Sequence, residues 1–249
     1  MRIPRIYQDT FLSVGDTISL DAQATVHISR VLRLRSHDPV IVFNGRGGEF
    51  HGRILSQEKR STVIALESFD DRSAESQISI TLAQGISRGE RMDYTVQKAV
   101  ELGVTQITPI MTERTSVNLD HERQQRRREH WQAVVQSACE QCGRNTVPIV
   151  TEIQTYASFL SPARQADSAL MCKLVLYHKA ESTLAAVSPE SNTFELLIGP
   201  EGGLSESEIQ AAQHAGYLLV RLGPRVMRTE TAAMVALAIL QSQWGDLRR

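Results

Sequence analysis

Two glycine-containing turns near the C-terminus carry the residues best suited to chemistry. The first is LLIGPEGGL, residues 196–204, and the second is LGPRVMRTETAA, residues 222–233. In each, an apolar stretch runs into a charged turn and then into an expected helix, which is how α/β proteins present backbone groups to a ligand. Glycine lets backbone amides and carbonyls approach a ligand where a Cβ would intrude. Because Glu201 lies in one turn and Glu230 in the other, the pair predicts a shared pocket.

The glycine patterns of these turns restrict the class of ligand that we expect. Neither has the pattern GxxxxGK[ST], nor GxGxxG after a first strand, so a nucleotide held by its phosphates is poorly supported. A ligand read by backbone hydrogen bonds, such as an adenosine group, fits better. The second turn also has a plainer interpretation as a β-to-α connection, in which Thr229 or Glu230 lies near a helix N-terminus and an acid suits the helix dipole.

The chain after residue 72 predicts the sheet that must hold these turns. Strands are expected at 78–84, 104–111, 147–150, 170–176, 195–198 and 218–222, and helices at 92–102, 123–141 and 230–244. Ser205 and Glu208 have the spacing of a capping box, and Gly216 can end the helix that they begin. This alternation predicts an α/β fold, with a mostly parallel sheet covered by helices on both faces.

The first 72 residues have a different pattern. Short β-type runs at 17–20, 40–43, 49–54 and 61–66 are separated by turns, which predicts a small β-barrel. One helix is expected at 27–34. The link at 70–76 is polar and has no large apolar residue, so we expect one domain over residues 1–72 and a second over residues 73–249.

Composition excludes several classes of protein. The 249 residues are 41% hydrophobic and 22% charged, which is typical of a globular protein of one or two domains. The longest apolar run is far shorter than the roughly 20 residues that span a bilayer, and the N-terminus lacks the apolar segment of a signal peptide. We therefore expect a cytoplasmic protein with no membrane partner.

The cysteines favour a reduced state. Cys139, Cys142 and Cys172 are odd in number, which argues against a disulfide framework. Cys139 and Cys142 form a CxxC pair, but no second pair and no histidines at ligand spacing follow. Reduced helix cysteines and no metal are expected, with metal or redox use as the alternative.

The balance of charges gives a mixed signal about nucleic acid. A net charge of −1 argues against a strongly cationic protein that wraps nucleic acid. The cations are nevertheless 23 Arg and 4 Lys, and guanidinium groups grip phosphate and stack on bases. GC-rich coding or ordinary surface preference explains the same bias.

Several longer segments together resemble one family. They are MRIPRIY at 1–7, SRGERMDYTVQKAVELGV at 87–104, ACEQCGRN at 138–145, LLIGPEGGLSESEI at 196–209 and LGPRVMRTETAA at 222–233. In this order they resemble the RsmE family, methyltransferases that modify uridine at N3 in bacterial small-subunit (16S) ribosomal RNA. The resemblance spans the whole chain. It implies a PUA-like N-terminal barrel that binds RNA and a SPOUT-type catalytic domain, whose C-terminal trefoil knot holds S-adenosylmethionine.

The resemblance also implies partners and a cofactor site. The partners are ribosomal RNA or the small ribosomal subunit and a second copy of the chain, with the site near the subunit interface. Backbone groups of three turns would read the adenine edge, and apolar side chains would pack on its faces. The cofactor-binding residues would be Leu176, His178, Ile198, Gly199, Pro200, Gly202, Gly203, Leu222, Gly223, Val226, Met227, Arg228, Thr231 and Ala232. His178 has an alternative as a solvated loop histidine.

Methylation at this position would make two demands on side chains. The uracil N3 carries a proton and becomes nucleophilic only as that proton leaves, so a carboxylate is needed to accept it, directly or through water. A cation beside the uracil oxygens would stabilise the developing anion. Arg228 is the candidate cation, and Glu201 and Glu230 are the candidate acceptors. Glu201 has an alternative as a brace of its turn, and Glu230 as a helix-start acid.

RNA contacts are expected from arginines that lie in the family segments or near the expected first helix. They are Arg2, Arg5, Arg30, Arg33, Arg88 and Arg144, each with an alternative as a solvated surface residue. Two rival classes stay open at this point. One is an RNA-binding module without activity, and the other is an enzyme that uses another adenosine-type or nucleotide cofactor.

Overall fold

The computed structural model describes the chain except residues 1–2, 21, 27, 30–31, 59–60, 118–119, 168–169 and 249, and except the side chains of 22–23 and 165–167. The chain divides into two compact units. The barrel unit comprises residues 1–75 and 136–147, and the sheet unit comprises residues 76–135 and 148–249. Residues 136–147 thus lie in the barrel unit, although the predicted boundary at residue 72 places them in the second domain.

The barrel unit is built on one five-stranded sheet with the order β1-β3-β4-β5-β2. Its strands are β1 Arg5–Tyr7, β2 Thr17–Leu20, β3 Pro39–Phe43, β4 Glu49–Gln57 and β5 Thr62–Asp70. Strand β1 pairs with β3 in parallel, and the other pairs are antiparallel. Two register shifts between β4 and β5 are irregularities of the kind that bend a sheet. Alternate side chains such as Val42, Ile54 and Ile64 form its core, which confirms the predicted small β domain.

The helix predicted at 27–34 is only partly confirmed: residues 28–29 are helical, with π-helix geometry, and residues 32–34 are not. Helix α1 is Ala22–Val26. Arg33 has φ 55°, a left-handed conformation that cannot continue a right-handed helix. Ile28 and Leu34 are buried in the barrel core.

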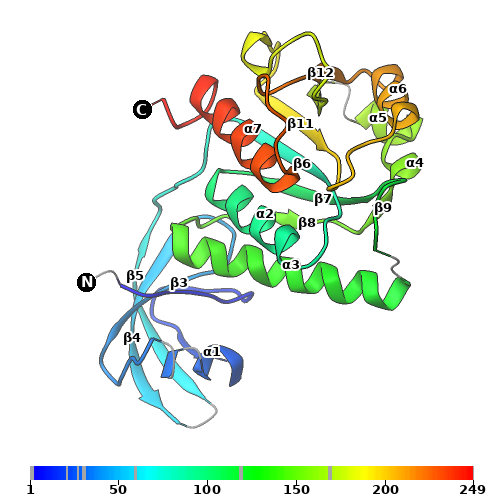
Figure 1. Ribbon diagram of the computed structural model, residues 1–249. Coiled ribbons are helices and arrows are strands. Elements are labelled where there is room, and N and C mark those ends of the chain that lie inside the picture. Colours follow the sequence, from blue (N-terminus) through cyan, green and yellow to red (C-terminus); the bar gives the residue numbers. More distant parts are fainter. Residues whose placement is uncertain are drawn as a thin grey trace. The chain divides into compact units, whose positions relative to one another are not determined.

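The sheet unit contains a seven-stranded parallel sheet with the order β12-β10-β11-β6-β7-β8, and β9 also pairs with β7 (Figure 1). Its strands are β6 Ser79–Gly85, β7 Gln106–Met111, β8 Ile149–Val150, β9 Gln154–Thr155, β10 Cys172–Leu176, β11 Thr193–Ile198 and β12 Leu218–Val220. The central strands β6 and β11 are almost wholly buried, as expected where helices cover both faces of a sheet. The predicted α/β fold is confirmed.

Helices cover both faces of this sheet (Figure 1). They are α2 Glu90–Glu101, α3 His121–Cys142, α4 Tyr156–Phe159, α5 Pro162–Asp167, α6 Glu206–His214 and α7 Thr229–Gln243, with a 3-10 turn at Leu184–Ala186. On one face, Phe159 of α4 and Ile209 of α6 share a core with Leu197 of β11. Helices α2 and α7 pack together on the other face. Within the described ranges, none of these helices is long and apolar enough to span a membrane.

The predicted capping box fixes the start of α6. The Ser205 hydroxyl accepts a hydrogen bond from the Glu208 amide at 3.3 Å, and the Glu208 carboxylate accepts one from the Ser205 amide at 2.9 Å. The same carboxylate accepts a hydrogen bond from the Glu113 amide at 2.8 Å. These hydrogen bonds hold the C-terminal end of the glycine-containing turn, where α6 begins.

Candidate functional site

The two glycine-containing turns line one cavity of about 690 Å³, which is a usual size for a small-molecule site. Strands β11 and β12 flank β10 in the sheet, so their carboxyl ends and the turns that follow lie at one edge. Every residue predicted to bind the cofactor lines this cavity except Thr231, which lines a second cavity beside it. The candidate catalytic residues Glu201, Arg228 and Glu230 line the first cavity as well.

The first turn packs against the end of β6 with no room for side chains. A Cβ on Gly85 would lie 2.4 Å from the Pro200 nitrogen, and one on Gly199 would lie 2.8 Å from the Leu204 nitrogen. A real Cβ atom essentially never lies this close to another heavy atom, so a side chain at either position would force the backbone to shift. Glycine at 85 therefore lets the turn lie close to β6, and glycine at 199 lets the turn close on itself; residues 199–203 line the cavity.

A buried polar chain joins the two turns. Thr229 Oγ1 donates a hydrogen bond to the Gly199 carbonyl at 2.7 Å, and Gln84 Nε2 donates one to Thr229 Oγ1 at 3.0 Å. Gln84 and Thr229 are both buried. No local sequence signal predicts this contact, because β6 contains two other polar residues, Ser79 and Thr81.

Glu201 is held by donors from the loop before α2 and from α2 itself. Its Oε1 accepts hydrogen bonds from the Arg88 amide at 2.9 Å and from Arg91 Nη1 at 3.1 Å. Burial alone would raise the pKa of this carboxyl. The hydrogen bonds from the Arg88 amide, from its own amide and from Arg91 outweigh burial and hold the pKa below its ordinary value. Glu201 is thus an ionised carboxylate that ties the first turn to the start of α2.

Arg228 and Glu230 differ from Glu201 in their contacts with the described residues. Arg228 is the exposed N-cap residue of α7, and no described residue forms an ion pair with its guanidinium group. Glu230 Oε2 is buried and has no hydrogen-bond partner among the described residues. Both side chains line the first cavity and the second. The Arg228 side chain is therefore open to a bound molecule, Glu230 Oε2 is enclosed beside the cavities, and Glu201 Oε1 is engaged.

The rim of the cavity contains a cluster that the sequence did not predict. Tyr177 Oη donates a hydrogen bond to Glu206 Oε2 at 3.0 Å, and Lys179 Nζ forms an ion pair with Glu206 Oε1 at 3.0 Å. The hydrogen bond to Glu206 raises the pKa of Lys179, and Lys179 lowers the pKa of Glu206. The exposed His178 lies edge-on to Tyr177, with 5.5 Å between ring centroids.

The chain is similar to known proteins over almost its whole length. A family model described as an RNA methyltransferase domain matches residues 74–241, and one described as an RNA methyltransferase PUA domain matches residues 20–66. Ribosomal RNA small subunit methyltransferase E of Buchnera aphidicola subsp. Schizaphis graminum is 35% identical over 246 residues, which cover 99% of this chain and 98% of the relative. The chain belongs to the ribosomal RNA small subunit methyltransferase E (RsmE) family. The resemblance of its sequence motifs is confirmed.

Solved structures of relatives agree with this RsmE assignment. The crystal structure of ribosomal RNA small subunit methyltransferase E from Neisseria gonorrhoeae, bound to S-adenosylmethionine, is 41% identical, with a TM-score of 0.93. A methyltransferase from Legionella pneumophila in complex with the same cofactor is 38% identical, also with a TM-score of 0.93. Each comparison covers 99% of this chain and 100% of the other.

Two arginines of this RsmE family member that were expected to contact RNA are buried in the barrel unit. Arg5 is 6% exposed, forms an ion pair with Glu49 and donates a hydrogen bond to the Arg144 carbonyl at 3.1 Å. Arg144 is 4% exposed and donates a hydrogen bond from Nε to Glu75 at 3.1 Å. These interactions hold β1 and the segment 143–147 in the barrel unit, so both arginines have a structural role.

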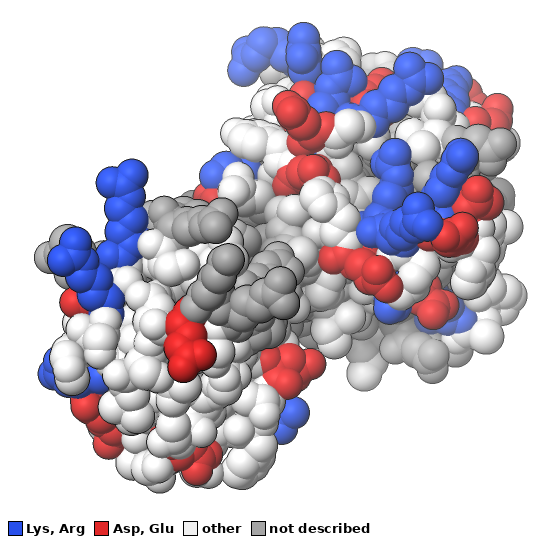
Figure 2. Space-filling view, turned by 90° about the horizontal axis from the view of Figure 1, so that it is seen from below, with Lys and Arg blue, Asp and Glu red and all other residues white. Residues whose placement is uncertain are grey.

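The remaining arginines expected to contact RNA divide into two groups. Arg33 is exposed in the loop before β3, and Arg88 is exposed with its Nε donating to Ser116 Oγ at 2.6 Å. Arg2 and Arg30 lie outside the described residues. On the face seen in Figure 2, basic and acidic side chains are interspersed, in keeping with the near-neutral net charge of −1.

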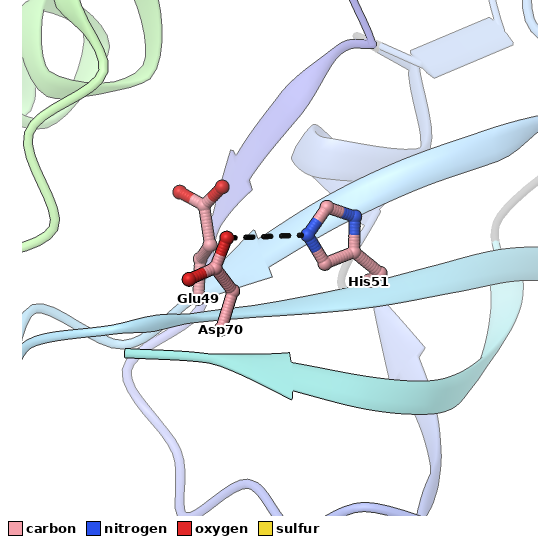
Figure 3. Close-up of side chains that lie close together, drawn as sticks. All are labelled: Glu49, His51 and Asp70. Atoms are coloured by element: carbon pink, nitrogen blue, oxygen red, sulfur yellow. Dashed lines mark ion pairs between the residues drawn. The ribbon is translucent and has the colours of Figure 1, made fainter. Parts of the chain in front are cut away.

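The barrel unit also contains a cluster of possible metal ligands, Glu49, His51 and Asp70 (Figure 3). Their ligand atoms lie within 4.8 Å of one another, and the Asp70 carboxylate points toward His51, with 4.0 Å between Oδ2 and Nε2. Glu49, however, is ion-paired with Arg5 and with Arg72, the latter at 3.0 Å. Two guanidinium groups already neutralise this buried carboxylate, which disfavours a cation beside it.

Cys139, Cys142 and Cys172 form no disulfide bond. Cys139 is buried in α3, and burial raises the pKa of its thiol to about 12. A protonated buried thiol is neither a nucleophile nor a metal ligand. The structure thus agrees with the expected reduced helix cysteines.

Proposed function

We propose that this chain is an S-adenosylmethionine-dependent methyltransferase that methylates N3 of a uridine in small-subunit (16S) ribosomal RNA. The observation that carries the proposal is the cavity between the two glycine-containing turns, in a chain 41% identical to a relative bound to S-adenosylmethionine. Membership of the RsmE family supports the reaction and the RNA substrate. Adenosine-type ligands are the class that backbone-presenting turns of this kind suit.

The residues of the cavity fit S-adenosylmethionine. Residues 199–203 line the cavity, glycine lets this turn lie close to β6, and Leu176, Ile198 and Leu222 supply apolar walls. These groups would read the adenine edge and cover its faces, together with the other predicted cofactor residues. When bound, S-adenosylmethionine supplies an activated methyl group on a positively charged sulfur. The protein must still make the acceptor atom, uracil N3, nucleophilic.

Three side chains are proposed for that task. Arg228 would stabilise the negative charge that develops on the uracil oxygens as N3 loses its proton. Glu230 and Glu201 are the candidate carboxylates that line the cavity, and one of them would accept the proton; Glu206, which also lines it, is paired with Lys179. Positioning contributes as well, because holding two reactants in line is worth up to about 7–11 kcal/mol in favourable systems.

The proposed division of labour follows the two predicted domains. Residues 1–72 would bind RNA through a PUA-like barrel, and residues 73–249 would catalyse transfer in a SPOUT-type domain with a C-terminal trefoil knot. A cytoplasmic homodimer, with the site near the subunit interface, completes the proposal. Among the predicted RNA-binding arginines, Arg33 and Arg88 have the exposure that contact with RNA requires.

Binding calorimetry tests the cofactor. The chain should bind S-adenosylmethionine and S-adenosylhomocysteine and should not bind NAD. Binding of NAD alone would favour an enzyme with another cofactor, and binding of RNA without any of the three would favour a module without activity.

Arg228→Ala tests the chemistry. It should lower the single-turnover methylation rate more than the affinity for S-adenosylmethionine, because the cation acts on the acceptor. A wild-type rate would remove Arg228 from the mechanism.

Paired arginine variants test the RNA surface. The double variant Arg30→Ala/Arg33→Ala should weaken RNA binding and flatten its dependence on salt, because fewer counterions are released. An unchanged salt slope would place the RNA elsewhere.

A further inference from the structure

A second cavity of about 710 Å³ adjoins the proposed cofactor cavity. It is lined by side chains of α2, α3 and α7, including Tyr94, Gln97 and Met234. Arg91, Arg228 and Glu230 line both cavities. A molecule in the second cavity would therefore meet, across these three charged side chains, whatever occupies the first.

We propose that the second cavity receives the uracil base that becomes methylated, with Tyr94 as the stacking surface and Glu230 as the acceptor of the N3 proton. This inference rests on the proposed function and adds to it the place of the acceptor base and the choice between the two carboxylates.

Tyr94 offers a surface that a base can use. It is 44% exposed and lines the second cavity, so part of its side chain is open to a ligand. Lys98 Nζ lies 5.8 Å from the ring centroid. Stacking of a base on an aromatic side chain is worth about 1–3 kcal/mol. The Gln97 amide is exposed in the same cavity and has the donor and acceptor that match a uracil edge.

The choice between Glu201 and Glu230 follows from their hydrogen bonds. Glu201 Oε1 already accepts from the Arg88 amide and from Arg91. Glu230 Oε2 is buried and has no donor among the described residues, and a buried acceptor without a donor is costly. Rotation of the Glu230 side chain toward the second cavity, which it lines, would bring this oxygen to the N3–H of a uracil, the missing donor. Two further carboxylates, Glu90 and Asp93, line the second cavity. Asp93 is engaged by His130 at 2.9 Å and by Trp131 Nε1 at 3.1 Å. Glu90 is exposed, so water can supply its donors.

The step balances with these groups alone. The N3–H bond breaks as its proton passes to Glu230 Oε2, and negative charge spreads onto the uracil oxygens near Arg228. The N3 electron pair forms the new bond to the methyl carbon, and the carbon–sulfur pair stays on sulfur, which leaves as a neutral thioether. Glu230 then releases its proton to water.

Binding of RNA without turnover tests the stacking surface. A fluorescent uridine-containing fragment of 16S ribosomal RNA is titrated with the chain saturated with S-adenosylhomocysteine. Tyr94→Ala should raise the Kd of the fragment and the KM about 5- to 150-fold, the equivalent of 1–3 kcal/mol, with cofactor affinity unchanged. Tyr94→Phe keeps the ring and should stay within about twofold of the wild type. An unchanged Kd for Tyr94→Ala would overturn the stacking role. A change of oligomeric mass in sedimentation, with RNA affinity unchanged, would overturn it as well and would assign the cavity to an interface between copies.

The two carboxylates are tested against each other. Glu230→Gln should lower the single-turnover rate about 10²- to 10⁴-fold, the usual effect of losing a general base, with cofactor affinity retained. Glu201→Gln should lower cofactor affinity as well, because Glu201 braces the cofactor turn. A substrate with 5-fluorouridine, whose N3 proton is more acidic, should recover part of the rate of Glu230→Gln. A wild-type rate for Glu230→Gln overturns the assignment while the proposed function stands. A wild-type chain that binds the cofactor but methylates no uridine overturns both.

Discussion

Gly85→Ala should damage cofactor binding although Gly85 does not line the cofactor cavity. Gly85 ends β6, which lies between β11 and β7 and is hydrogen-bonded to both. The added Cβ would lie 2.4 Å from the Pro200 nitrogen and 2.8 Å from the Gly199 carbonyl carbon. A strand paired on both sides cannot easily move, so residues 199–200 must yield. Those residues line the cavity.

The expected magnitude comes from the cost of overpacking. An added methyl group that forces a backbone shift typically costs about 1–3 kcal/mol. If the displaced turn must regain its wild-type position to bind the cofactor, the free energy of binding becomes weaker by this amount, which raises the Kd about 5- to 150-fold. The effect should be at the upper end, because the atoms met are backbone atoms of a turn that the Thr229 hydroxyl also holds.

Calorimetric titration with S-adenosylhomocysteine measures the effect, and Gly216→Ala is the matched control. Gly216 lies at the end of α6 with φ 87°, and an added Cβ would meet no atom within 4 Å. Gly216→Ala should cost about 1 kcal/mol of stability, through backbone strain alone, and leave the Kd unchanged. A folded Gly85→Ala protein with a wild-type Kd would refute the reasoning, because it would show that the turn does not need its contact with β6.

Three further predictions concern groups outside the cavity. Glu195 is buried on β11 and ion-paired with Arg164, so Glu195→Gln should lower the free energy of unfolding by about 3 kcal/mol in urea titrations, and a loss below 1 kcal/mol would contradict this. Glu49 is buried, which alone would raise its pKa, but hydrogen bonds from Arg5 and Arg72 hold the pKa below its ordinary value. The ionised Glu49 therefore stabilises the fold above the ordinary pKa of a glutamate, and this stabilisation is lost as the pH falls through the lowered pKa. Hydrogen exchange in residues 49–70 should accelerate on acidification in the wild type and respond less in Glu49→Gln, and equal responses would exclude Glu49 as the cause. Cys139, with a pKa of about 12, should resist iodoacetamide at pH 8 in the folded chain and react after unfolding in urea, whereas rapid labelling of the folded chain would count against its burial.

Much of the sheet unit could be predicted from the sequence because its signals are local. The strands of a parallel sheet buried on both faces are short apolar runs, and the Ser205–Glu208 capping box marks the start of α6. The cavity shared by the two glycine-containing turns was predicted for the same reason, since glycines, charged residues and flanking strands are neighbours in the chain. Thr231 is the exception among the predicted cofactor residues, because successive residues on α7 point in different directions and Thr231 faces the second cavity.

The parts that were missed depend on contacts between distant residues. Arg5 pairs with Glu49 across 44 positions and donates to the Arg144 carbonyl across 139, and no local pattern distinguishes such buried arginines from arginines on an RNA-binding surface. The same holds for Gln84, which donates a hydrogen bond to Thr229 across 145 positions. The difference between Glu201 and Glu230 was equally hidden, because it depends on donors from Arg88 and Arg91.

Nucleoside mass spectrometry tests the central claim most directly. The chain is incubated with S-adenosylmethionine that carries a deuterated methyl group and with 16S ribosomal RNA or small ribosomal subunits that lack the modification. The RNA is then digested to nucleosides. We predict deuterated 3-methyluridine as the labelled product, greatly reduced with Arg228→Ala and suppressed by excess S-adenosylhomocysteine. Label on another nucleoside or on a ribose oxygen, or no label in a preparation shown to bind the cofactor, would contradict the account.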